Sequence, residues 1–198
     1  MPLLSVETIH ADVQLGLWKI DETEEQLAAA YPQFAPQVEG FRAASRRLER
    51  WAVLALTAAM TGNEDIVLRH AENGAPQLDG WHISISHTKG YAAVILSCDR
   101  QVAVDVEYVS PRVATILHKF LSEDETPATL TEQLLCWCAK ETVYKLFPDS
   151  NLQYTEMHIR PFLLDDGAPI MAENRKNHLT LNVHYRHTEA YALTYAFL

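Results

Sequence analysis

The chain has 198 residues, of which 48% are hydrophobic and 21% charged, an ordinary composition for one large globular domain or two small ones. Its formal net charge of −10 argues against a general nucleic-acid or anionic-membrane surface, because both attract basic patches. The start of the chain lacks a signal-peptide pattern, and no apolar stretch reaches transmembrane length. With three cysteines and no CxxC spacing, we expect a cytoplasmic protein whose Cys98, Cys136 and Cys138 are buried, reduced thiols.

The first half of the chain is expected to form strands and two helices. A short helix fits residues 24–31, because Pro32 would end it. A long helix fits residues 38–60, where apolar residues recur at helical spacing and Gly62 follows the end. The apolar and alternating patterns predict strands over 15–20, 66–69, 82–86 and 91–98.

The second half repeats this order. We expect a strand over 102–106, a short helix over 111–120 and a long helix over 129–147, which Thr129 and Glu132 begin at capping-box spacing. Further strands fit 157–162, 179–185 and 191–197. The sequence therefore predicts an α+β fold with two similar lobes, 1–101 and 102–198, related by pseudo-twofold symmetry. Each lobe would pack a small antiparallel sheet on a long helix, and the internal duplication favours a monomer.

Acidic residues gather in two segments of the second half. Asp105 and Glu107 lie two apart in an apolar strand, so they share one face. Glu141 and Lys145 lie four apart on a predicted helix, one above the other. If the helix packs on the strand, three carboxylates and an ammonium converge, which suits a hard cation with a phosphorylated substrate. Alternatively, the strand simply reaches solvent and Glu141 with Lys145 is an ordinary helix-surface pair.

Basic residues gather in the first half. His87 follows an alternating strand at a turn, where its ring can donate to a phosphate oxygen. Arg42, Arg46 and Arg50 recur every four residues on the long helix, with Arg47 beside them. Guanidinium groups bind phosphates in a bidentate way. A surface histidine and a solvated helix face are the alternatives.

Taken in order, these segments and two others resemble the surfactin-type 4'-phosphopantetheinyl transferases, and the resemblance spans most of the chain. That family has an Arg-rich helix, a Gly-Lys-Pro turn, a Ser-His-Ser/Thr turn, a Gly-Ile-Asp-Ile-Glu-like strand, a Phe-x-Ser-x-x-Glu segment and a Trp-x-x-Lys-Glu-x-x-x-Lys helix. The corresponding residues here are Arg46-Arg47, Gly74-Ala75-Pro76, Ser86-His87-Thr88, 103–107, 120–125 and 137–145.

The resemblance implies a magnesium-dependent enzyme that moves 4'-phosphopantetheine from coenzyme A to a serine of an apo acyl or peptidyl carrier protein. It implies that Asp105, Glu107 and Glu141 ligate Mg²⁺, Glu107 either directly or through a water. Glu141, or a metal-bound water beside it, is the candidate base for the serine proton. Lys145 would contact the coenzyme A phosphates and act in catalysis.

The same resemblance assigns the remaining coenzyme A contacts. His87, beside Ser86 in the Ser-His-Thr turn, would contact phosphates and act in catalysis, and Lys140 would supply a third cation. One residue of the Arg46-Arg47 pair would hold the adenosine 3'-phosphate.

Three positions depart from the family pattern: Ala75 replaces the lysine of the Gly-Lys-Pro turn, Ala103 replaces a glycine, and residues 146–151 replace a Gly-rich turn. All proposed metal ligands are present, so we expect altered coenzyme A binding rather than lost chemistry. Two other functions stay open. One is a degenerate relative that binds coenzyme A or a carrier without turnover, and the other is a magnesium-dependent phosphohydrolase.

Overall fold

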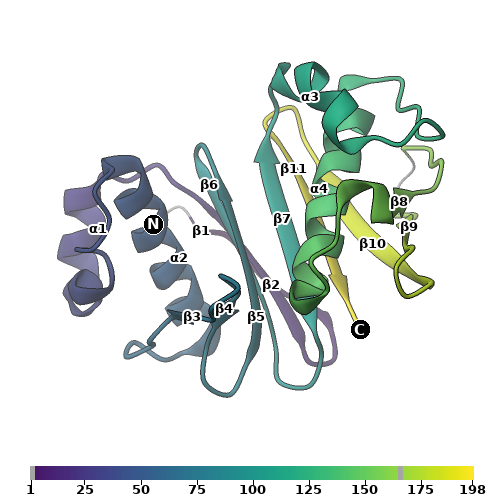
Figure 1. Cartoon of the computed structure of the whole chain (residues 1–198). Helices are drawn as coiled ribbons and strands as arrows, with labels where there is room; N and C mark the ends of the chain where they lie inside the picture. Colours follow the sequence, from purple (N-terminus) through teal and green to yellow (C-terminus); the bar gives the residue numbers. More distant parts are fainter. Residues whose placement is uncertain (1–2, 165–166) are drawn as a thin grey trace. The chain divides into compact units, whose positions relative to one another are not determined.

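The structure is a computed structural model that describes residues 3–164 and 167–198 (Figure 1). It has the predicted α+β class, with antiparallel strand pairs and separate helices. The chain divides into two compact units, Met1–Val102 and Ala103–Leu198. The pseudo-twofold relation between the halves stays a prediction.

In the first unit, the long helix α2 packs on a sheet with the strand order β1-β2-β6-β5. Neighbouring strands in this sheet are antiparallel, as are those of the small β3-β4 pair. Its elements are β1 (Leu3–His10), β2 (Val13–Lys19), α1 (Glu24–Ala30), η1 (Pro32–Gln37), α2 (Ala44–Thr61), β3 (Arg69–His70), β4 (Pro76–Gln77), β5 (His82–Thr88) and β6 (Tyr91–Ser97).

A glycine lets the sheet and α2 approach closely. A Cβ atom on Gly16 of β2 would lie 2.5 Å from the Sδ of Met60 and 2.9 Å from the Cδ1 of Leu56, closer than real Cβ contacts. Any larger residue would therefore push the strand away from the helix. Helix α2 ends at Gly62, whose φ of 66° is the left-handed cap that glycine adopts readily.

The start of α2 differs from the prediction. The helix begins at Ala44 rather than near residue 38. Residues 38–40 form a turn after the 3-10 helix η1, and Gly40 within this turn is a poor helix former. Arg42 therefore precedes α2, and the predicted stripe of arginines on one helix loses its first member. Strand β1 was not predicted.

In the second unit, helix α4 packs on a sheet with the order β7-β11-β10-β9-β8 (Figure 1). Strand β10 is antiparallel to β9 and β11, and β8 is antiparallel to β9. The elements are β7 (Val102–Tyr108), α3 (Arg112–Phe120), α4 (Leu130–Leu146), η2 (Pro148–Ser150), η3 (Tyr154–Glu156), β8 (Met157–Ile159), β9 (Ile170–Asn174), β10 (Leu179–His187) and β11 (Tyr191–Phe197).

Helix α4 begins with the predicted capping box: Thr129 accepts from the backbone N–H of Glu132, and the Glu132 carboxylate accepts from that of Thr129. This satisfies amide groups that the first helical turn leaves without partners. Strand β9 was not predicted, and β8 is shorter than the expected 157–162.

All three cysteines are free thiols. Cys136 and Cys138 are buried as predicted, but Cys98 is exposed because it directly follows the end of β6. In the described part of the chain, we find no helix that has both the length and the apolar character needed to span a membrane.

Candidate active site

Strand β7 carries two of the three predicted metal ligands toward helix α4. Asp105 and Glu107 alternate with Val104 and Val106 along the strand, so they share the face that bears Ala103, which packs in the α4 core. Asp105 is only 4% exposed. We call Asp105, Glu107 and Glu141 the acidic cluster.

Lys145, in the last turn of α4, reaches back to β7. Its ammonium donates to the Asp105 Oδ1 at 2.8 Å and to the Val104 carbonyl at 3.0 Å. Within the described residues, the ion pair of Lys145 is thus with Asp105 and not with Glu141. The alternative of an ordinary helix-surface pair between positions 141 and 145 is therefore wrong.

Glu141 is half-buried one helical turn before Lys145, and its Oε1 accepts a 2.8 Å hydrogen bond from the Tyr154 hydroxyl. Burial raises the pKa of Glu141, and the nearby charge of Asp105 raises it further, whereas Tyr154 and Lys145 oppose the rise. A carboxylate with a raised pKa is a stronger base than an exposed one, which suits a group that must accept a proton.

The third carboxylate has its own donor. The indole Nε1–H of Trp137 donates to the Glu107 Oε1 at 3.3 Å. Lys145, Trp137 and Tyr154 thus each donate to a different carboxylate. Among residues 3–164 and 167–198, no three His, Cys, Asp or Glu side chains form a group that could hold a metal ion. The donor set nevertheless fits Mg²⁺ chemically, since it is all oxygen and includes two carboxylates that repel each other.

Lys140 does not lie with the acidic cluster. It is fully buried, and its ammonium donates to the Phe120 carbonyl at 2.7 Å, the Glu125 carboxylate at 2.6 Å and the Tyr154 carbonyl at 3.2 Å. These acceptors use all three ammonium protons. In this structure Lys140 is therefore a structural cation of the second unit, and its contact with coenzyme A stays a prediction.

The first unit has a pocket of about 190 Å³ that combines basic and apolar residues. We call it the basic pocket. It brings together three segments that were singled out in the sequence: the start of α2, the Gly74-Ala75-Pro76 turn and the His87 position on β5. Its lining residues are Phe41, Arg46, Arg50, Val53, His70, Gly74, Pro76, Ile85 and His87.

A glutamate of α2 lies close to two residues of the basic pocket, Arg46 and His87. The Glu49 Oε2 lies 3.0 Å from the Arg46 Nη1 and 3.3 Å from the His87 Nδ1. The Glu49 side chain is 17% exposed, whereas that of Arg46 is 59% exposed. Glu49 thus binds one terminal nitrogen of the Arg46 guanidinium, while most of the side chain is exposed and can take up an anion.

The structure separates Arg46 from Arg47. Arg47 is not among the pocket residues; its Nε donates to Glu24 at 2.6 Å and its Nη1 to the carbonyls of Phe41 and Arg42. The hydrogen bond to Glu24 raises the pKa of Arg47. Of the predicted pair, Arg46 therefore remains the candidate for the 3'-phosphate, while Arg47 ties α2 to α1.

Ser86 also lies outside the basic pocket. It is buried, and it is the strand neighbour of His87, so its side chain points to the opposite face of β5. The coenzyme A contact of Ser86 stays a prediction, with its side chain on the other face of β5 from His87. Neither Lys140 nor Ser86 enters the function proposed below.

Sequence reasoning missed three residues that touch these sites. Tyr154 holds Glu141, Glu49 holds Arg46 and His87, and His70 lines the basic pocket. Glu49 carried a signal, because it lies three residues after Arg46 on the same helix face. Tyr154 and His70 lie in a short turn and a two-residue strand, where no periodic pattern indicates a contact.

Residues 101–196 match the model of the 4'-phosphopantetheinyl transferase superfamily. The match covers β7 and the whole of α4, and therefore all three residues of the acidic cluster together with Lys145. A search of curated proteins found no match.

Proposed function

Because residues 101–196 belong to the 4'-phosphopantetheinyl transferase superfamily, we propose that the protein transfers 4'-phosphopantetheine from coenzyme A to a serine of an apo acyl or peptidyl carrier protein, with Mg²⁺. Membership supports a transferase of this general kind. The surfactin-type assignment, the carrier substrate and the metal are the parts that we propose.

One observation carries the proposal. Within the segment that matches the family, Lys145 contacts Asp105 and stands one turn from Glu141, a half-buried carboxylate with a raised pKa. Strand β7 and helix α4 thus carry an ammonium group, Lys145, next to a metal-ligand candidate, Asp105, and a base candidate, Glu141. Phosphoryl-group transfer needs these parts, because its catalysis is mostly positioning and charge stabilisation.

The residues divide the chemistry among themselves. The carrier serine attacks the β-phosphorus of coenzyme A, the bond between the two pyrophosphate phosphates breaks, and 3',5'-adenosine diphosphate leaves. Glu141 accepts the serine proton. Lys145 offsets charge on the departing phosphate, which grows as the bond breaks. When bound by Asp105, Glu107 and Glu141, Mg²⁺ would neutralise pyrophosphate charge.

We expect turnover to require a divalent cation. Excess chelator should abolish carrier modification, and added Mg²⁺ or Mn²⁺ should restore it, because three carboxylates without a cysteine ligand favour hard cations. The measurement is the rate of modification across a metal titration. Full activity in excess chelator would rule out the metal assignment.

We expect Arg46 and Arg47 to behave differently. Arg46→Ala should raise the KM for coenzyme A at least about 10-fold, the effect of losing a charge-assisted hydrogen bond of about 1.5 kcal/mol. The KM for dephospho-coenzyme A should change little, because that substrate lacks the 3'-phosphate.

Arg47→Ala is the matched control, since it removes the same side chain from a position tied to Glu24. It should leave the ratio of the two KM values unchanged. An equal rise for both substrates in Arg46→Ala would show that Arg46 does not bind the 3'-phosphate. High salt should weaken coenzyme A binding through the same contacts.

A comparison of 3',5'-adenosine diphosphate release with and without apo carrier separates the transferase from its alternatives. Release that depends on the carrier supports transfer. Cleavage of coenzyme A without carrier would indicate the phosphohydrolase. Binding of coenzyme A with no release under either condition would indicate the degenerate relative, which Ala75 and residues 146–151 favour.

A further inference from the structure

A tyrosine outside the short motifs named from the sequence contacts Glu141 of the acidic cluster. We propose that Tyr154 is a positioning residue, whose hydroxyl orients the Glu141 carboxylate for a divalent cation. This inference rests on the metal role of Glu141 in the proposed function. It assigns to the short turn before β8 a part in metal binding.

The ring of Tyr154 is fixed by two aromatic neighbours. Its centroid lies 5.6 Å from that of Trp137 and 6.5 Å from that of Phe120, and the rings of Phe120 and Trp137 lie 5.1 Å apart with their edges meeting their faces. Such tilted and edge-to-face contacts limit rotation of a ring as well as burying it. The position of the Tyr154 hydroxyl is therefore restricted.

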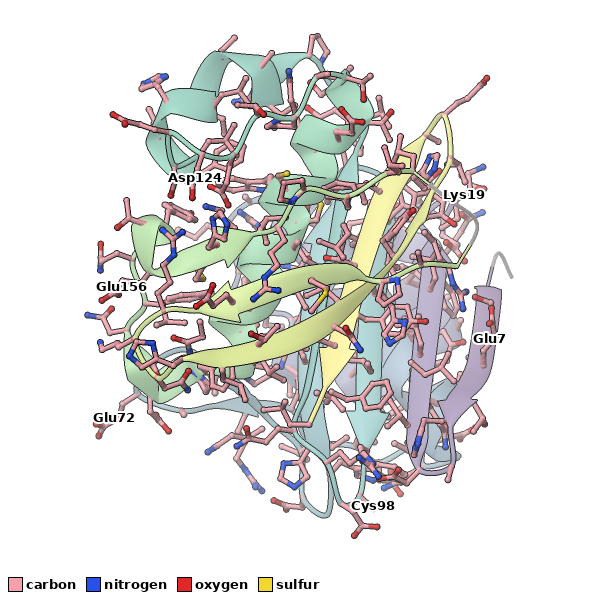
Figure 2. The ribbon with its side chains drawn as sticks, turned by 90° about the vertical axis from the view of Figure 1, so that its right-hand side faces the viewer. Glu7, Lys19, Glu72, Cys98, Asp124 and Glu156 are labelled. Atoms are coloured by element: carbon pink, nitrogen blue, oxygen red, sulfur yellow. The ribbon has the colours of Figure 1, made fainter. Side chains whose placement is uncertain are left out.

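The backbone of Tyr154 is fixed as well. Its carbonyl accepts a hydrogen bond from the ammonium of Lys140, and Lys140 is paired with the buried carboxylate of Glu125. Glu125 in turn accepts from the backbone N–H of Ser122, just after α3, and from that of Ile159 in β8, which directly follows the turn. Glu156, labelled in Figure 2, marks the end of this turn on the molecule. The buried Lys140–Glu125 pair thus explains how a residue 13 positions after Glu141 can hold it.

Tyr154 and Trp137 act on neighbouring carboxylates. The tyrosine hydroxyl donates to Glu141 at 2.8 Å, and the Trp137 indole donates to Glu107 at 3.3 Å. A phenol is protonated at neutral pH, so Tyr154 can donate this hydrogen bond. Because Oε1 of Glu141 accepts from the phenol, the orientation of the carboxylate is restricted. Donors that orient metal ligands in this way change metal affinity by about 10–100-fold when removed.

The test measures Mn²⁺ binding directly, by the loss of the free-ion signal in electron paramagnetic resonance, in the absence of coenzyme A. Four proteins are compared: wild type, Tyr154→Phe, Tyr195→Phe and Glu141→Gln. Tyr195→Phe is the matched control, because it removes a phenol hydroxyl from the same unit at a half-buried ring that stacks on His184. Thermal unfolding of each variant establishes that it is folded.

We expect Tyr154→Phe to weaken Mn²⁺ binding at least about 10-fold, and Tyr195→Phe to bind as the wild type does. Wild-type affinity in folded Tyr154→Phe, with weakened binding in Glu141→Gln, would overturn the role of Tyr154 alone. A wild-type protein that binds no Mn²⁺, or a Glu141→Gln protein that binds it normally, would overturn the metal site and this inference with it. Equal losses in Tyr154→Phe and Tyr195→Phe would also overturn the inference, because they would show a general effect on the fold.

Discussion

Replacing Glu141 by glutamine is expected to lower the kcat of carrier modification at least ~100-fold, the lower end of the range for general-base catalysis. The amide has the shape of the carboxylate, but it can neither accept the serine proton nor supply an anionic oxygen to Mg²⁺. Steady-state rates at saturating coenzyme A and carrier measure the effect.

The same substitution should leave the fold intact. Glutamine still accepts a hydrogen bond from Tyr154, and it removes a half-buried charge that Asp105 repels. Glu189→Gln, at an exposed turn before β11, is the control and should keep the wild-type kcat. A folded Glu141→Gln protein that modifies its carrier at the normal rate would refute the base and ligand roles of Glu141.

Replacing Lys140 by methionine is expected to lower the free energy of unfolding by about 3–5 kcal/mol, the usual cost of leaving one member of a buried ion pair without its partner. The Glu125 carboxylate would stay buried and lose the 2.6 Å contact to the ammonium, and the carbonyls of Phe120 and Tyr154 would lose donors. Denaturant unfolding followed by circular dichroism measures the change.

Lys119→Met provides the control for this prediction. Lys119 is an exposed residue in the last turn of α3 in the same unit, so the same substitution there should change the free energy of unfolding by no more than about 0.5 kcal/mol. Equal, small effects at both positions would show that the Lys140–Glu125 pair does not hold the second unit together. If Lys140→Met instead lost coenzyme A binding with unchanged stability, the result would support a contact between Lys140 and a coenzyme A phosphate.

The sequence predicted those parts of the site that follow from periodicity. The two-residue period of β7 puts Asp105 and Glu107 on one face, and helix α4 brings Lys145 to that face. The capping box at Thr129 also fixed where α4 begins. In the first unit, the turn at Gly74, the strand end at His87 and the start of α2 all line the basic pocket. The family resemblance assigns these segments to coenzyme A, so it predicts that they lie close together.

Adjacent charged residues on a helix were harder to assign. Lys140 and Glu141 point about 100° apart, as do Arg46 and Arg47, because each helical residue turns by that angle. Only the packing of neighbouring elements decides which member of each pair faces the site. Here Lys140 and Arg47 turn to structural acids, Glu125 and Glu24.

Contacts made by irregular segments could not be predicted from the sequence. Tyr154 reaches Glu141 from a three-residue 3-10 turn, and its position depends on the buried Lys140–Glu125 pair rather than on any repeat. The late start of α2 has a similar cause, since residues 38–43, where apolar spacing alone predicts a helix, form a turn and irregular backbone instead.

The most direct measurement is the intact mass of an apo carrier protein after incubation with this protein, coenzyme A and Mg²⁺, beside a parallel reaction in excess chelator. We predict that the carrier gains the mass of one phosphopantetheine group at its acceptor serine with Mg²⁺, and none in chelator. A carrier mass that stays unchanged in both reactions, with folded protein and several carriers tried, would contradict the proposed transfer.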